Sequence, residues 1–229
     1  RNPRLLKEFS PEASSVIAQA FRDEGIELFL GATLERVEKL SDGQVRVHFS
    51  HAGKTIARDT GYLFNALGRH PAVNSLDLVA AGIKTLPEGH LMTNEFQLTT
   101  NPSVYAAGDC SGPHEIVHVA IRQGEIAAAH ALGKEVSPMT YDGLLRVAFT
   151  DPQVAYVGLS PAEIDARDFS FASASYPFED HGKSILMEAK RGYVAVHAEK
   201  PGGRLLGAEC VGKDVGELIH ALSVGISLK

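Results

Sequence analysis

The chain has 229 residues, of which 44% are hydrophobic and 22% charged, and its formal net charge is −6. These values are typical of a globular protein with one large domain or two ordinary ones. Lys and Arg are scattered rather than clustered, which argues against a nucleic-acid or anionic-membrane surface, and no apolar run reaches the roughly 20 residues needed to cross a bilayer.

The first sixty residues are predicted to form a helix, a buried strand and an antiparallel meander. Residues 10–25 carry apolar side chains at helical spacing, with Ser10 placed to cap the helix and Pro11 at its first position. The apolar run Ile26–Leu30 is predicted to be a buried strand. Three strands follow it, with a hairpin signal at Asp42-Gly43: residues 33–39, 45–50 and 54–59.

The middle of the chain contains few strong patterns. An apolar run at residues 62–67 is predicted to be a strand that ends at Gly68-Arg69-His70-Pro71. Residues 72–102 are predicted to be rich in loops, and Val104–Ala107 a short strand. Helical periodicity then extends over residues 115–132, and Gly133 closes that helix.

The last ninety residues predict an antiparallel sheet with helices packed on it, which is an α+β arrangement. Ser160-Pro161 starts a short helix, and residues 214–228 form a final amphipathic helix. The expected strands have alternating apolar residues or lie beside clear turns: residues 147–149, 154–157, 169–176, 192–200 and 204–211.

The residues best suited to bind a ligand lie where the predicted strand Val104–Ala107 ends. Gly108 removes the side chain there and lets the backbone approach a ligand, while Asp109 places an acceptor suited to a sugar-like hydroxyl. Gly112-Pro113 then begins a helix whose first turn offers free N–H groups to an electron-rich group. Taken alone, Gly-Asp is also consistent with an ordinary turn at the end of a strand.

Two segments give this site a family context. Residues 99–110 match a T-x-x-P-x-[IV]-[YF]-A-x-G-D run, and residues 65–71 precede them with an A-x-G-R-x-P-like run. Together they resemble the two-dinucleotide-binding flavoproteins. The C-terminal part of the chain resembles the interface domain of class I pyridine nucleotide-disulfide oxidoreductases, in three segments: residues 149–159, 207–212 and 216–219.

The resemblance implies a fold and a division into domains. The fold would be α/β plus α+β, the C-terminal part of a two-dinucleotide-binding flavoprotein fold with an antiparallel-sheet dimerisation domain. Residues 1–69 would end the NAD(P)-binding domain. Residues 70–138 would form the second segment of the FAD-binding domain, and residues 139–229 a truncated interface domain.

The resemblance also implies which residues contact the cofactors FAD and NAD(P). Asp109 would bind the ribityl chain of FAD, with the Gly108 backbone against it. Gly68 would lie against the nicotinamide dinucleotide, with Leu34 as a second candidate. The start of the following helix would approach the isoalloxazine ring: Glu115, Ile116, Val117 and His118.

Several motifs of the family are missing from this sequence. The redox pair C-x-x-x-x-C, the glycine-rich phosphate loops and the histidine motif H-x-H-P-T-x-x-E are not found. We therefore expect a fragment that contains no catalytic residue and is inactive alone. In the family that the chain resembles, the histidine of each substrate site comes from the partner subunit, which implies a homodimer.

The resemblance leaves several activities open for the complete protein. His118-Val119-Ala120 resembles the A-H-x-A of dihydrolipoamide dehydrogenases and makes that activity the first choice, with a disulfide or dithiol substrate and a lipoyl protein as one candidate partner. A mercuric reductase is second, because Phe149–Gln153 fits that branch equally well, and glutathione reductase ranks below both. A non-catalytic dimerisation fragment is the alternative from another class.

The remaining reactive side chains favour structural interpretations. Cys110 and Cys210 lack a CxxC spacing, so both are expected to be packed residues in a reducing, cytoplasmic protein. The histidines at 114, 118 and 220 share no ligand spacing, and no metal site is expected.

Residues 178–183 are expected to form a solvated loop. Arg69 is expected either to pair with a cofactor phosphate or to cap a turn.

Overall fold

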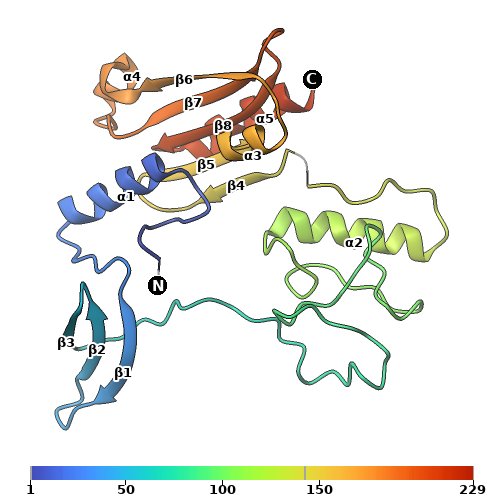
Figure 1. Ribbon diagram of the computed structural model, residues 1–229, viewed down its shortest axis with the longest axis horizontal. Coiled ribbons are helices and arrows are strands. Elements are labelled where there is room, and N and C mark those ends of the chain that lie inside the picture. The colour runs from blue at the N-terminus through green and yellow to red at the C-terminus, as the bar shows by residue number, and fades with distance from the viewer. Residues whose placement is uncertain (1, 142, 229) are drawn as a thin grey trace. The chain divides into compact units, whose positions relative to one another are not determined.

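The computed structural model describes residues 2–141 and 143–228. It divides into two compact units, one of residues 64–141 and one that joins residues 1–63 to residues 142–229 (Figure 1). Within the described residues, no helix has the length and apolar character that crossing a bilayer requires.

The larger unit is built around a five-stranded antiparallel sheet. Its strand order is β4-β5-β8-β7-β6. The strands are β4 (Leu145–Ala148), β5 (Gln153–Gly158), β6 (Phe171–Pro177), β7 (Tyr193–Glu199) and β8 (Leu205–Gly212). The antiparallel sheet predicted for this part of the chain is therefore confirmed.

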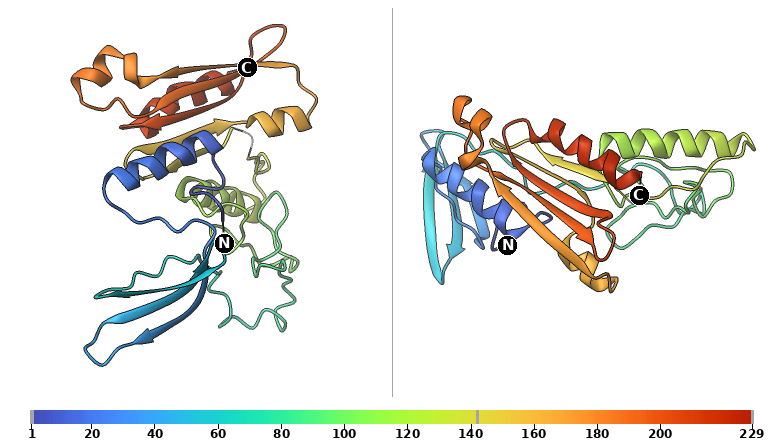
Figure 2. Two further views of the ribbon diagram at one scale, coloured as in Figure 1. Left: turned by 60° about the vertical axis from the view of Figure 1, so that its left-hand side comes forward. Right: turned by 90° about the horizontal axis from the view of Figure 1, so that it is seen from above.

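Helices cover both faces of this sheet. Neighbouring residues of a strand point to opposite faces, so each face presents its own set of side chains to a helix. Helix α5 (Val215–Ser227) packs against the face that carries Ala208 and Cys210. Helix α1 (Pro11–Asp23) packs against the other face, where Val154 and Val211 lie. Both helices can be followed against the sheet in Figure 2.

A buried carboxylate joins the start of α1 to the sheet. Ser10 caps the helix, since its Oγ accepts a hydrogen bond from the N–H of Ala13 at 3.0 Å. Ser10 also donates to Glu209 on β8, from its N–H at 3.0 Å and from its Oγ at 2.5 Å. The Tyr193 hydroxyl donates to the same carboxylate at 2.6 Å. The sequence predicted the cap but not this long-range contact.

The predicted meander is confirmed as a three-stranded antiparallel sheet. Its strands are β1 (Thr33–Lys39), β2 (Val45–His51) and β3 (Lys54–Thr60), in that order. The predicted hairpin turn lies between the first two strands, where Gly43 has φ +87° and the Asp42 carboxylate accepts a hydrogen bond from the N–H of Gln44.

Two predicted strands are wrong. Ile26–Leu30 and residues 62–67 have no strand pairing, and Tyr62 and Phe64 are 94% and 90% exposed. A strand exists only through backbone hydrogen bonds to a neighbour, and neither segment forms a ladder with a described strand, although the Phe29 side chain packs against Phe49 of β2. The predicted strand Val104–Ala107 is reduced to one bridge, between Tyr105 and Leu98.

The helical segments differ from expectation mainly at their ends. Helix α2 (Val117–Ala131) begins two residues later than the periodicity predicted. The short helix α3 (Pro161–Ala166) has the predicted Ser160 cap. The segment expected as a solvated loop is exposed except at Phe178, which packs against the sheet core. It forms a 3-10 turn at Phe178–Asp180 followed by the short helix α4 (Gly182–Leu186).

Candidate functional site

The turn that carries Gly108 and Asp109 is fastened to α2. Gly108 has φ +82°, and its N–H donates to the Gln123 side chain at 2.7 Å. Gln123 is fully buried, and its amide donates to the Gly112 carbonyl at 3.1 Å and to the Tyr141 hydroxyl at 3.0 Å. One glutamine therefore fixes both ends of the turn.

Sequence analysis did not assign a role to Gln123. It was recognised only as part of the helical periodicity, although it shares the buried face of α2 with Val119 and Ile126. A polar side chain on an otherwise apolar helix face was the available signal, because a buried amide must find hydrogen-bond partners.

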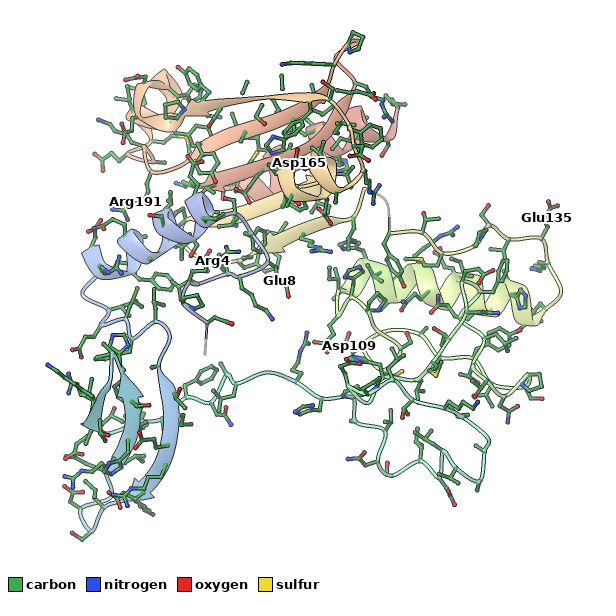
Figure 3. The ribbon with its side chains drawn as sticks, viewed as in Figure 1. Arg4, Glu8, Asp109, Glu135, Asp165 and Arg191 are labelled. Atoms are coloured by element: carbon green, nitrogen blue, oxygen red, sulfur yellow. The ribbon has the colours of Figure 1, made fainter. Side chains whose placement is uncertain are left out.

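Asp109 follows Gly108 in this turn, and its carboxylate is an exposed hydrogen-bond acceptor, with 54% of the side chain accessible. Figure 3 labels Asp109 beside the end of α2 at which that helix begins. Its Oδ2 lies 3.3 Å from Nη1 of Arg69. Within residues 2–141 and 143–228, its Oδ1 receives no hydrogen bond, so this oxygen is available to a hydroxyl donor.

The start of α2 is uncapped by any described side chain. Ile116 is the N-cap residue, it makes no side-chain cap hydrogen bond, and the first turn has no acidic residue. Val117 is 78% exposed, and His118 is also exposed. The free N–H groups and the positive end of the helix dipole therefore favour an electron-rich ligand here.

Glu115 lies between two basic groups just before α2. Its Oε2 is 2.7 Å from Nη2 of Arg69, and its Oε1 is 3.7 Å from Nε2 of His90. Arg69 thus binds two carboxylates at once, Asp109 and Glu115. Neither carboxylate contact was predicted from the sequence, and the interpretation of Arg69 as a partner of a cofactor phosphate stays a prediction.

The chemistry of this donor set fits a flavin dinucleotide. An exposed carboxylate oxygen suits the hydroxyl groups of a ribityl chain, and the uncapped helix start suits the electron-rich edge of an isoalloxazine ring. The predicted residues at this turn and helix start do lie together in one unit: Gly108, Asp109, Glu115, Ile116, Val117 and His118.

The two residues predicted for NAD(P) lie in different units, each with its own surroundings. Gly68 has φ +120° and open space around it, which is compatible with a close approach by a ligand. Leu34 lies on β1 and is 42% exposed. Their assignment therefore stays a prediction.

The cysteines occupy packed positions, as predicted. Cys110 is partly buried against the cluster of Val73, Leu91 and Ala106. Cys210 is fully buried beneath α5, and burial raises the pKa of its thiol to about 12. Among the residues that the structure describes, no group of three or more His, Cys, Asp or Glu is arranged to hold a metal ion.

Two family models match the chain. The model described as pyridine nucleotide-disulphide oxidoreductase matches residues 1–124, and the model of the corresponding dimerisation domain matches residues 144–229.

Curated relatives share the full extent of the chain. A mercuric reductase of Bacillus cereus is 32% identical over 99% of it, and a dihydrolipoyl dehydrogenase of Halobacterium salinarum is 28% identical over 98%. The chain spans 36% and 47% of the lengths of these two relatives.

Solved structures show the same similarity. LpdA from Mycobacterium tuberculosis matches with a TM-score of 0.84 at 28% identity, covering 95% of this chain and 47% of that one. The flavoprotein disulfide reductase RclA from Escherichia coli matches with a TM-score of 0.86 at 22% identity, covering 98% and 51%. The second match indicates a shared fold only.

Proposed function

The chain belongs to the pyridine nucleotide-disulphide oxidoreductase family, and from this premise we propose that it supplies one side of the FAD site of an NAD(P)H:disulfide oxidoreductase. The family uses FAD and NAD(P)H. The observation that supports the proposal is the Asp109 carboxylate, which Gln123 holds through the Gly108 turn next to the uncapped start of α2.

Each side chain has a defined task in this proposal. Asp109 accepts a hydrogen bond from a hydroxyl of the cofactor, and the first N–H groups of α2, from Val117 and His118, face its electron-rich edge. Gln123 keeps the turn and the helix in fixed relation. When bound, FAD carries electrons between the nicotinamide and the disulfide.

The domain division is part of the proposal. We assign residues 1–69 to the end of an NAD(P)-binding domain, residues 70–138 to the second segment of the FAD-binding domain and residues 139–229 to the interface domain. The ranges of the two family models, 1–124 and 144–229, support a change of domain after residue 124. Gly68 and Leu34 are the proposed NAD(P) contacts.

Dimerisation is indicated by the match of residues 144–229 to a dimerisation domain. That the partner is a second copy of the same chain, and that the protein is cytoplasmic, are our proposals. The proposed substrate is a small disulfide or dithiol, with a lipoyl protein as one candidate partner.

Dihydrolipoamide dehydrogenase activity remains the first choice and mercuric reductase activity the second. The sequence identities overlap and so do not decide between them: two mercuric reductases are 32% and 27% identical, and two dihydrolipoyl dehydrogenases are 28% and 29% identical. Rates of NADH or NADPH oxidation by the natural, full-length protein, with lipoamide or Hg²⁺ as acceptor, decide between the two activities and identify the nucleotide.

Asp109→Asn tests the proposed flavin site. We expect the natural, full-length protein to show the visible spectrum of bound flavin. The variant should bind FAD roughly 10- to 100-fold more weakly, because a hydrogen bond to a charged group contributes about 1.5–3 kcal/mol. The measurement is the Kd of FAD for the apoprotein, by quenching of flavin fluorescence.

Glu125→Gln is the matched control, since Glu125 is an exposed carboxylate on α2 that pairs with Arg122. Its Kd should equal that of the unmodified protein. A protein that dimerises yet holds no flavin when FAD is supplied would refute the proposal and favour the dimerisation-fragment alternative.

A further inference from the structure

Arg69 lies at the end of the segment that leads into the flavin-site unit, forty residues before Asp109. Its guanidinium reaches both Asp109 and Glu115, with N···O distances of 3.3 and 2.7 Å. A planar guanidinium has donors in a fixed fork, so binding two carboxylates fixes their directions as well as their charge.

The contact engages only one oxygen of Asp109. Nη1 of Arg69 binds Oδ2, which leaves Oδ1 for a ligand. Glu115 in turn holds the other arm of Arg69, and its second oxygen faces His90. The three residues therefore form a chain of contacts in which Arg69 determines how Asp109 presents its free oxygen.

Charge leads to the same conclusion. Without Arg69, the Asp109 and Glu115 carboxylates would lose the cation that both contact, and the repulsion between them would no longer be offset. The ion pairs are half exposed at present, so water weakens them. A bound ligand that displaces this water would strengthen them.

We propose that Arg69, anchored by Glu115, is a positioning residue that orients the Asp109 carboxylate toward the ribityl hydroxyls of the flavin. The inference rests on the proposed function, because it assigns Arg69 an action through Asp109, which contacts the cofactor in that proposal.

The test is a double-mutant cycle on the natural, full-length protein, with the Kd of FAD as the readout. Arg69→Gln should weaken FAD binding by roughly tenfold, and Arg69→Lys should weaken it less, because lysine keeps the charge but loses the fork. In the Asp109→Asn background, Arg69→Gln should cause no further loss.

Arg122→Gln is the matched control, because Arg122 is an exposed arginine of the same unit that pairs with Glu125 at 3.1 Å. Its FAD affinity should equal that of the unmodified protein. An equal loss in Arg122→Gln and Arg69→Gln would overturn the inference, and so would a full further loss from Arg69→Gln in the Asp109→Asn background.

The two hypotheses fail in different ways. A natural protein that never binds FAD refutes the proposed function itself. A protein that binds FAD, depends on Asp109 and is indifferent to Arg69→Gln refutes only the positioning role.

Discussion

Gln123 shows how a single buried side chain can determine the shape of a ligand-binding turn. Its carbonyl oxygen accepts from Gly108, and its amide donates to the Gly112 carbonyl and the Tyr141 hydroxyl. Replacing it leaves buried backbone groups without partners, and each such group costs about 1–3 kcal/mol.

Gln123→Leu is expected to lower the free energy of unfolding by roughly 2–4 kcal/mol, since leucine fills the space but satisfies neither Gly108 nor Gly112. FAD affinity should fall as well, because Asp109 follows Gly108 directly. Urea denaturation measures the first effect. Gln19→Leu is the control, since Gln19 bonds only to the Asp23 side chain at an exposed position, and a similar loss there would contradict the argument.

At the residue scale, the sequence predicted what short motifs encode. Gly108 and Asp109 were singled out because they belong to a continuous motif in the chain. The contacts of Gln123 with Gly108 and of Arg69 with Asp109 were not predicted, because these partners lie 15 and 40 residues apart along the chain. Side-chain contacts over such separations depend on packing that local patterns do not specify.

Elements with local signals were predicted well, and elements that depend on a neighbour were not. The capped helices α1 and α3 begin at the serines expected to cap them, Ser10 and Ser160. Ile26–Leu30 has the composition of a strand, and its side chains contact β2 and β3, but its backbone pairs with no described strand. Composition indicates suitability for a sheet, whereas pairing requires a partner.

The stability contributed by the start of helix α3 should depend on pH through Glu163. Burial tends to raise the pKa of Glu163, but hydrogen bonds from the Ser160 backbone and side chain outweigh it and hold the pKa below the usual 4.5. A lowered folded-state pKa gives stability that is present above the ordinary glutamate pKa and is lost as pH falls through the folded value.

Glu163→Gln should therefore lose less stability than the unmodified protein when the pH is lowered from neutral to below 4.5. Ser160→Ala should cost about 1 kcal/mol at neutral pH and weaken the acid dependence only in part, because it removes the cap and the hydroxyl hydrogen bond to Glu163 but keeps the backbone N–H that donates to the same carboxylate. Urea denaturation across this pH range measures both. An acid-dependent loss in Glu163→Gln equal to that of the unmodified protein would contradict the prediction.

At the scale of the whole chain, Glu209 connects regions that two different family models match. Ser10 lies within residues 1–124 and Glu209 within residues 144–229. The carboxylate is 5% exposed and accepts from the Ser10 N–H and Oγ and the Tyr193 hydroxyl. The sequence predicted the helix and the strand but not their contact, which spans 199 residues.

Glu209→Ala should release the start of α1 from the sheet. The Ser10 N–H would lose its acceptor, and the Ser10 and Tyr193 hydroxyls would keep their contact with each other at 3.2 Å but lose the carboxylate, so the free energy of unfolding should fall by roughly 2–4 kcal/mol. The amides of α1 should also exchange with solvent faster than those of α5, which packs on the opposite face. Glu199→Ala is the control, because Glu199 pairs with Arg204 near the surface and should cost about 1 kcal/mol or less. Unchanged exchange in α1 would mean that apolar packing alone holds this helix on the sheet, and that the buried carboxylate does not join the two regions.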